Sequence, residues 1–148
     1  MVASDYRESH IRTGRGARYD AYYRPGTALA FYWEHFERPF LEEKVAEAVA
    51  GPGSRRYLDF ACGTGRILQV GAAWIPDATG IDVSEEMLNV ARQKVPRARI
   101  IRADVLRESV LDVGTFDVVT LFRFLVRAGL LREPILVWLR SVIRKTAR

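Results

Sequence analysis

The sequence has few of the residues that build disulfide frameworks, metal centres or histidine-based catalytic sites. Its 148 residues include one cysteine, Cys62, and two histidines, His10 and His35. A single cysteine excludes an internal disulfide and leaves no cluster of soft metal ligands. Each histidine is more typical of an ordinary surface or helix position than of a general base. We therefore expect neither a disulfide framework nor a metal site.

Long hydrophobic runs are also missing. No stretch approaches the roughly 18 to 20 apolar residues that a membrane span needs, and the N-terminal stretch is polar rather than signal-like. The length suits one domain with a core of its own. We expect a single-domain, soluble, cytoplasmic protein with no membrane partner.

Lysine is scarce in this basic chain, whose formal net charge is +5. Its lysines are Lys44, Lys94 and Lys145, and the arginines are scattered from Arg7 to Arg148. A nucleic-acid-binding surface usually concentrates basic residues and interleaves them with aromatic ones. The scatter therefore makes a nucleic-acid partner unlikely.

Residues 1–26 have the composition of an arm or loop, with charges, glycines and four tyrosines. We predict a flexible N-terminal arm over 1–26 that serves as a lid, followed by one main domain over 27–148. Tyr19, Tyr22 and Tyr23 are its candidate lid residues, although packing in a helix or core explains them equally well.

After the arm, the pattern first predicts helices and then an alternation of strands and helices. Thr27 is suited to cap a helix, and Pro39 either kinks that helix or opens the next one. Beyond Gly51, short β-prone runs alternate with helical ones, which is typical of a parallel α/β sheet. The predicted strands are 56–60, 78–82, 99–102 and 116–121. The predicted helices between and after them begin near Gly65, cover 84–95 with Ser84 as the cap, and cover 130–148.

The first predicted strand runs through small residues into a helix, in the sequence Asp59-Phe60-Ala61-Cys62-Gly63-Thr64-Gly65. Glycines allow a sharp turn and close approach of a ligand, and the N-terminus of the following helix offers unpaired N–H groups. Taken alone the pattern is weak, because any tight strand-to-helix turn has similar needs.

Acidic residues end the next two predicted strands. Asp82, before Val83, is placed to accept hydrogen bonds from both hydroxyls of a ribose, and its charge strengthens such bonds. Asp104, before Val105, is placed to accept from an adenine amine. Both lie at the carboxyl edge of the sheet, where nucleosides bind in such folds. The alternatives are a helix cap for Asp82 and a solvated turn for Asp104.

Four segments in order resemble the motifs of class I S-adenosylmethionine-dependent methyltransferases: LDFACGTG, GIDVSEEML, ADVL and FDVVTLF. The resemblance covers about residues 55–125 and implies a Rossmann-like fold with S-adenosylmethionine as cofactor. The residues that it implies for the methionine part are Asp59, Ala61, Cys62, Gly63 and Gly65. Those for the nucleoside are Asp82, Val83, Asp104 and Val105. Where the family usually has its first glycine, this chain has Ala61, whose methyl group we expect to crowd the cofactor slightly.

Two other nucleotide-binding patterns fit less well. The small residues do not follow the G-x-G-x-x-G spacing of dinucleotide-binding folds, and no lysine follows them as in a P-loop.

After the fourth predicted strand, the resemblance implies that Phe122 and Arg123 face the transferred methyl group, although Phe122 is equally explained by core or lid packing. No asparagine or aspartate followed by proline and an aromatic residue occurs there, which weighs against methylation of DNA bases or amides. We therefore expect methyl transfer to a small molecule by direct displacement. That reaction depends on alignment, so the sequence identifies no catalytic residue.

The resemblance implies seven strands, of which this sequence predicts four. We expect an incomplete sheet of order 3-2-1-4, with helices on both faces, truncated after the fourth strand and its helix. Without a neighbour, strand 116–121 has an open edge, which predicts a homodimer through that strand. The alternative function is a cofactor-binding module or pseudoenzyme that needs a partner chain.

Overall fold

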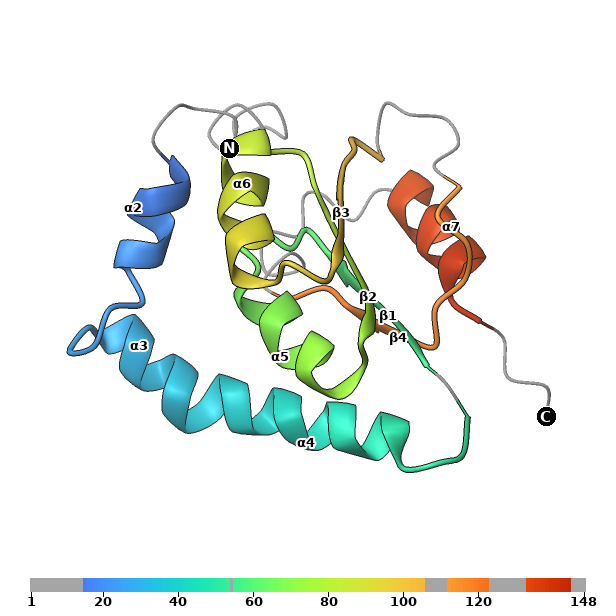
Figure 1. The fold of residues 1–148 in the computed structure, drawn as a ribbon, viewed down its shortest axis with the longest axis horizontal. Helices are drawn as coiled ribbons and strands as arrows, with labels where there is room; N and C mark the ends of the chain where they lie inside the picture. The colour runs from blue at the N-terminus through green and yellow to red at the C-terminus, as the bar shows by residue number, and fades with distance from the viewer. Residues whose placement is uncertain (1–14, 54, 106–111, 123–132, 145–148) are drawn as a thin grey trace.

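The structure, a computed structural model, describes residues 15–53, 55–105, 112–122 and 133–144. It contains one parallel four-stranded sheet, and helices precede, connect and follow its strands (Figure 1). The strands are β1 (Arg56–Phe60), β2 (Asp77–Asp82), β3 (Arg99–Arg102) and β4 (Val118–Thr120). The helices are α2 (Arg15–Ala21), α3 (Ala28–Tyr32), the π-helix η1 (Trp33–Glu37), α4 (Arg38–Val49), α5 (Arg66–Trp74), α6 (Glu85–Lys94) and α7 (Glu133–Val142).

The strand order is β3-β2-β1-β4, which confirms the predicted order and the α/β class. In the register, Asp59 of β1 lies opposite Gly80 of β2 and opposite Thr120 of β4. Because all strands are parallel, their carboxyl ends lie at the same edge of the sheet.

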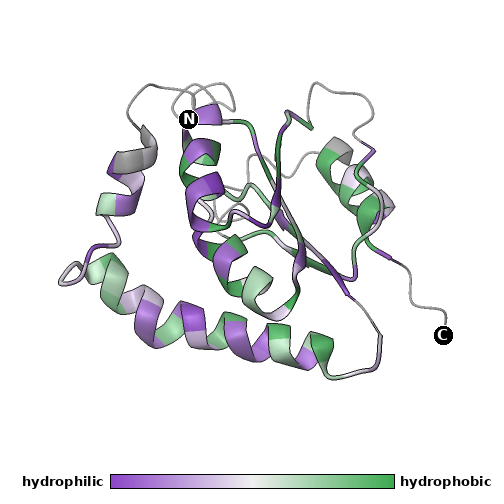
Figure 2. Ribbon diagram, viewed as in Figure 1, coloured by the Kyte–Doolittle hydropathy of each residue, from purple (hydrophilic) through white to green (hydrophobic). Residues whose placement is uncertain are grey.

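Helices cover both faces of the sheet, as predicted, because side chains alternate between the faces along each strand. Tyr57 and Ala78 pack with residues of α4, α5 and α6 on one face. Leu58 and Phe60 point to the opposite face, where α7 lies. Figure 1 shows α7 on one side of the strands and α4 to α6 on the other. Figure 2 shows hydrophobic and hydrophilic residues mixed along α4, whose covered side is marked by the buried Leu41 and Val45.

The helical segments α3, η1 and α4 follow one another directly and form one long rod (Figure 1). Thr27 caps it as predicted, since its side chain accepts a hydrogen bond from the Ala30 N–H. Pro39 lies in the first turn of α4, the second of the two predicted alternatives. The π-helix η1 between α3 and α4 turns Trp33 into the core, where its side chain is buried.

The predicted arm falls partly outside the described residues, and the boundary at residue 26 stays a prediction. From residue 15 onward the chain forms α2, which packs against α6. A Cβ on Gly16 would lie 3.0 Å from the Glu86 carbonyl oxygen, so the absence of a side chain allows this close approach. Figure 1 shows the two helices side by side.

At the other end of the chain, β4 is shorter than predicted. Phe116 is fully buried and forms an isolated parallel bridge with Ile143, just after α7. Its N–H donates to the Val142 carbonyl (2.7 Å), and its carbonyl accepts from the Arg144 N–H (2.8 Å). The prediction that nothing pairs with this side of strand 116–121 is therefore wrong at Phe116. The helix also ends at Val142, because the chain there turns to make these bonds.

Candidate functional site

The predicted site residues follow the carboxyl ends of the four parallel strands. Topology thus brings together the loop after β1, the acidic residues at the ends of β2 and β3, and Phe122 beyond β4. Two backbone bonds tie neighbouring ends: Cys62 N–H donates to the Ile81 carbonyl (3.0 Å), and Ala103 N–H donates to the Asp82 carbonyl (3.1 Å).

The loop after β1 turns through left-handed backbone angles. Ala61, Gly63 and Gly65 have φ values of 58°, 54° and 80°. Within the described residues, Ala61 is the one non-glycine with a positive φ. For alanine this conformation costs about 1 kcal/mol or slightly more. The family's usual glycine at this position thus matches a backbone requirement, and replacing it with alanine strains the turn itself.

Gly63 and Gly65 serve different purposes in this turn. A Cβ on Gly65 would lie 3.0 Å from the Cβ of Ala91, so this glycine lets the start of α5 approach α6. A Cβ on Gly63 would meet only the Met87 sulfur, at 3.5 Å, within 4 Å. Gly63 therefore has free space on the side where a side chain would stand, which is what close approach of a ligand needs.

Asp82 joins the ends of β1 and β2 to the start of α6. Its Oδ2 accepts from the Gly63 N–H (2.9 Å), and its Oδ1 accepts from the Ser84 N–H (2.9 Å). Ser84 occupies the N-cap position as predicted, but its own side chain makes no capping bond. Asp82 therefore has a structural role in holding the glycine turn. Each carboxylate oxygen has capacity for a further bond, so this role is compatible with contact to a ribose.

Asp59 lies completely buried beneath the turn. Its Oδ1 accepts a hydrogen bond from the Thr120 hydroxyl (2.7 Å), and its Oδ2 is buried without a hydrogen-bond partner among the described residues. Burial in this dry environment raises the pKa of Asp59 to about 7, assisted by the charge of Asp82 and opposed by the Thr120 bond and by Arg66. A buried carboxylate oxygen with no partner is suited to accept from a cationic ligand.

The ends of β3 and β4 contribute the remaining predicted residues. Asp104 and Val105 are half-buried, and Val105 packs against Phe60, Ile135 and Leu139. Phe122 packs edge-on against Trp33, with ring centroids 6.4 Å apart. Arg123 lies outside the described residues.

The N-terminal segment contacts the glycine turn at two points. The Thr64 hydroxyl donates to Asp20 Oδ1 (2.7 Å), and the Lys94 ammonium donates to the same oxygen (2.8 Å). Arg66, the first residue of α5, lies between the rings of Tyr23 and Trp33, at 3.7 and 4.1 Å.

The three candidate lid tyrosines differ in their surroundings. Tyr23 packs against the core and contacts the ring of Tyr19 at 5.6 Å, whereas Tyr22 is 59% exposed.

Several residues of this site were missed at the sequence level. Tyr57 was missed, although it lies two positions before the predicted Asp59 on the same strand, so their shared face could have been predicted from the alternation. Asp20, Arg66 and Thr120 gave no such signal, because their contacts join segments far apart in the chain. Across the described residues, no group of three or more histidine, cysteine or acidic side chains is arranged to hold a metal ion, and no helix is long and apolar enough to cross a membrane.

Comparison with protein-family models matches residues 58–144, more than half of the chain, to the methyltransferase domain. A search of curated proteins found no significant match. Among solved structures, CalS10 of Micromonospora echinaspora, an amino pentose methyltransferase bound to SAM, is 27% identical with a TM-score of 0.63. The match covers 86% of this chain and 52% of CalS10.

Two further structures share the fold. KedS8 of Streptoalloteichus, a sugar N-methyltransferase, is 31% identical with a TM-score of 0.50, over 68% of this chain and 38% of KedS8. The magnesium protoporphyrin IX methyltransferase ChlM of Synechocystis, with bound SAH, is 20% identical with a TM-score of 0.69, over 95% of this chain and 67% of ChlM.

The chain thus spans about half of the length of CalS10 and less of KedS8. With the matched domain model and this Rossmann-like sheet, the chain belongs to the methyltransferase domain family of the class I fold.

Proposed function

We propose that this chain binds S-adenosylmethionine at the carboxyl edge of its sheet and transfers the methyl group to a small molecule. The observation that carries the proposal is the turn after β1. It has free space beside Gly63, and beneath it lies Asp59, whose Oδ2 is buried without a hydrogen-bond partner among the described residues. CalS10 and ChlM, which share the fold, were crystallised with this cofactor or its demethylated product.

The residues present fit such a cofactor. Asp59 would accept from the positively charged amine of its methionine part, while Gly63 lets that part approach the backbone. Asp82, at the end of β2, would accept from the ribose, and Asp104 with Val105 would border the adenine. The cofactor supplies a methyl group on a sulfonium, which is already activated for displacement.

The chain's own contribution is to orient the reactants and exclude water. Phe122, which packs on Trp33, and the tyrosines of the N-terminal segment are the residues that we assign to this covering role. The bonds from Thr64 and Lys94 to Asp20 would hold the segment against the turn during the reaction.

For the acceptor, we propose a small molecule, and amino sugars are the first class of acceptor to test. CalS10 and KedS8, which are 27% and 31% identical to this chain, are described as an amino pentose methyltransferase and a sugar N-methyltransferase. In this displacement the acceptor itself is the nucleophile, and an amine is nucleophilic once deprotonated. The reaction therefore requires no nucleophile from the protein.

Two measurements test the proposal. Titration calorimetry of the whole chain with S-adenosylhomocysteine should show one site, and mass spectrometry should detect S-adenosylhomocysteine formed from S-adenosylmethionine in the presence of amino sugars. No heat and no thermal shift at millimolar ligand would contradict cofactor binding. Binding without turnover over the whole acceptor panel would favour the second candidate, a cofactor-binding module that needs a partner chain.

A further inference from the structure

Beneath the glycine turn, three polar side chains form a hydrogen-bonded row inside the core. The Tyr57 and Thr120 hydroxyl oxygens are 2.7 Å apart, and the Thr120 hydroxyl donates to Asp59 Oδ1 over 2.7 Å. Tyr57 and Asp59 belong to β1, and Thr120 lies opposite Asp59 on β4. Tyr57 and Asp59 are at most 1% exposed.

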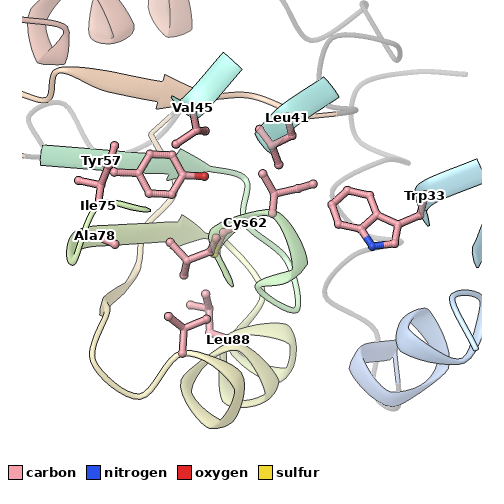
Figure 3. Packing of buried hydrophobic residues seen from close by; sticks show 11 residues of the cluster. Trp33, Leu41, Val45, Tyr57, Cys62, Ile75, Ala78 and Leu88 are labelled. Atoms are coloured by element: carbon pink, nitrogen blue, oxygen red, sulfur yellow. The ribbon is translucent and has the colours of Figure 1, made fainter. Parts of the chain in front are cut away.

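The row has a fixed direction whenever Asp59 is ionised. A hydroxyl has one proton, so Thr120 cannot donate to both neighbours. Since Thr120 donates to Asp59, Tyr57 must donate to Thr120. The two dipoles then both point toward the carboxylate. Figure 3 shows the Tyr57 ring lying along β1, with its hydroxyl directed toward the end of the strand where Cys62 begins the turn.

We propose that Tyr57 and Thr120 are positioning residues that hold the Asp59 carboxylate ionised and oriented, so that its other oxygen receives the amine of the bound cofactor. This inference rests on the proposed function. Oδ1 is committed to the row, whereas Oδ2 is buried without a hydrogen-bond partner in the part of the chain that the structure describes. The row therefore fixes which oxygen remains for a ligand.

The surroundings of Asp59 make this support necessary. Burial raises the pKa of Asp59 to about 7, and the nearby charge of Asp82 acts in the same direction. The Thr120 bond lowers it, as do the Arg66 charge and the nearby Leu68 backbone N–H, which acts on the carboxylate without meeting the geometry of a hydrogen bond. The other titratable neighbours, Tyr57 and the Cys62 thiol, have pKa values raised by their own burial and so remain neutral.

The sign of the pH dependence follows. An amine beside Asp59 favours the ionised form, so the carboxyl group must lose its proton when the cofactor binds. Affinity should be highest between the pKa of Asp59 in the free protein and the pKa of the ligand amine, and it should fall as the pH drops below about 7. The fall should approach tenfold per pH unit.

The test measures S-adenosylhomocysteine affinity by calorimetry from about pH 6 to about pH 8.5 for the whole chain and three variants. Thr120→Val keeps the shape of the side chain and removes the hydroxyl donor, whereas Thr120→Ser keeps the hydroxyl donor. Tyr57→Phe keeps the ring and removes only its hydroxyl group. Thr120→Val should move the midpoint of the affinity profile upward by about one pH unit. Tyr57→Phe should move it less, in the same direction, and Thr120→Ser should match the parent chain.

A merely structural role gives a different result. It would weaken binding by the same factor at every pH, and that outcome, or an unchanged profile in both Thr120→Val and Tyr57→Phe, overturns the inference. If Thr120→Val does not fold, Tyr57→Phe still decides, because it removes one oxygen from a side chain that keeps its ring.

A second ligand separates this inference from the proposed function. An S-adenosylhomocysteine analogue with hydrogen in place of the amine should bind without the pH dependence and should not respond to these substitutions. Equal pH dependence for both ligands overturns the inference while cofactor binding stands. No binding of S-adenosylhomocysteine to the parent chain at any pH overturns both.

Discussion

The central strands of the sheet and its edge strand β4 differ in how completely they are paired and buried. In the centre, β1 and β2 are paired along both edges, and their central residues are buried. At the edge, β4 has three residues, all partly exposed, and a strand neighbour only in β1 as far as the structure is described. The glycine turn thus follows a well-packed central strand, while Leu121 and Phe122 follow the less covered edge strand.

This difference separates two properties of the chain. The contacts of Asp59, Gly63 and Asp82 come from β1, β2, α5 and α6, together with Thr120 at the end of β4. Cofactor binding therefore depends on contacts that the described chain already makes. The surface that β4 presents to an acceptor depends, in addition, on the segment that lies next to this strand.

The largest effect should come from adding a side-chain atom to the packed interface between α5 and β1. Gly71 of α5 lies directly against the Tyr57 ring, and a Cβ at this position would overlap that ring. Gly71→Ala should lower the free energy of unfolding by about 3 kcal/mol, because the buried ring has little room to move. Gln69→Ala, on the exposed side of the same helix, should stay within about 0.5 kcal/mol of the parent chain. Urea unfolding followed by circular dichroism measures both, and equal stabilities would show that α5 is loosely packed on β1.

Much of the fold could be predicted from the sequence, because local rules and topology agree for the central elements. The bounds of β1 and α6 and the start of α5 follow from glycine, helix-cap and periodicity signals. The sheet order came from the family resemblance. Asp82 carries its own chemistry and could be identified as an acceptor, whereas Asp59 came from the family resemblance. The roles of both in binding the cofactor stay predictions.

The rest depended on contacts between distant segments. No local signal shows that Phe116 pairs with Ile143, that Asp20 reaches Thr64, or that Asp82 takes the Gly63 N–H. The left-handed angle of Ala61 was also missed, because an alanine in a sequence gives no indication of backbone strain. These features follow from packing and from hydrogen bonds that only the folded chain brings together.

A smaller effect is expected from a substitution that compares the two ends of β2. Asp82 ends this strand and binds the turn, whereas Asp77 begins it and pairs with Arg56 over 3.2 Å at the exposed opposite edge. Asp82→Ala should weaken S-adenosylhomocysteine binding by about 2 kcal/mol, the scale of a hydrogen bond to a charged group. Asp77→Ala should leave affinity unchanged. Calorimetry of both variants decides, and equal losses would place the ligand away from the carboxyl edge.

The smallest effect concerns the two edge strands, and it tests our proposal that the chain forms a homodimer through β4. At one edge, β3 begins and ends with exposed arginines, Arg99 and Arg102, which discourage pairing with another strand. At the other edge, β4 consists of Val118, Val119 and Thr120 and has no charge.

A two-fold symmetric dimer would pair two copies of β4 antiparallel, which satisfies the open edge of both. Three residues allow only a few hydrogen bonds, each worth about 1 kcal/mol net, so the association should be weak and concentration-dependent. Analytical ultracentrifugation over a dilution series should therefore show monomers combining into dimers as concentration rises. Hydrogen exchange should show the β4 amides becoming more protected over the same range, while those of β3 do not change. A chain that remains monomeric at every concentration with β4 already protected would contradict the proposal, since the edge would then be covered from within the same molecule.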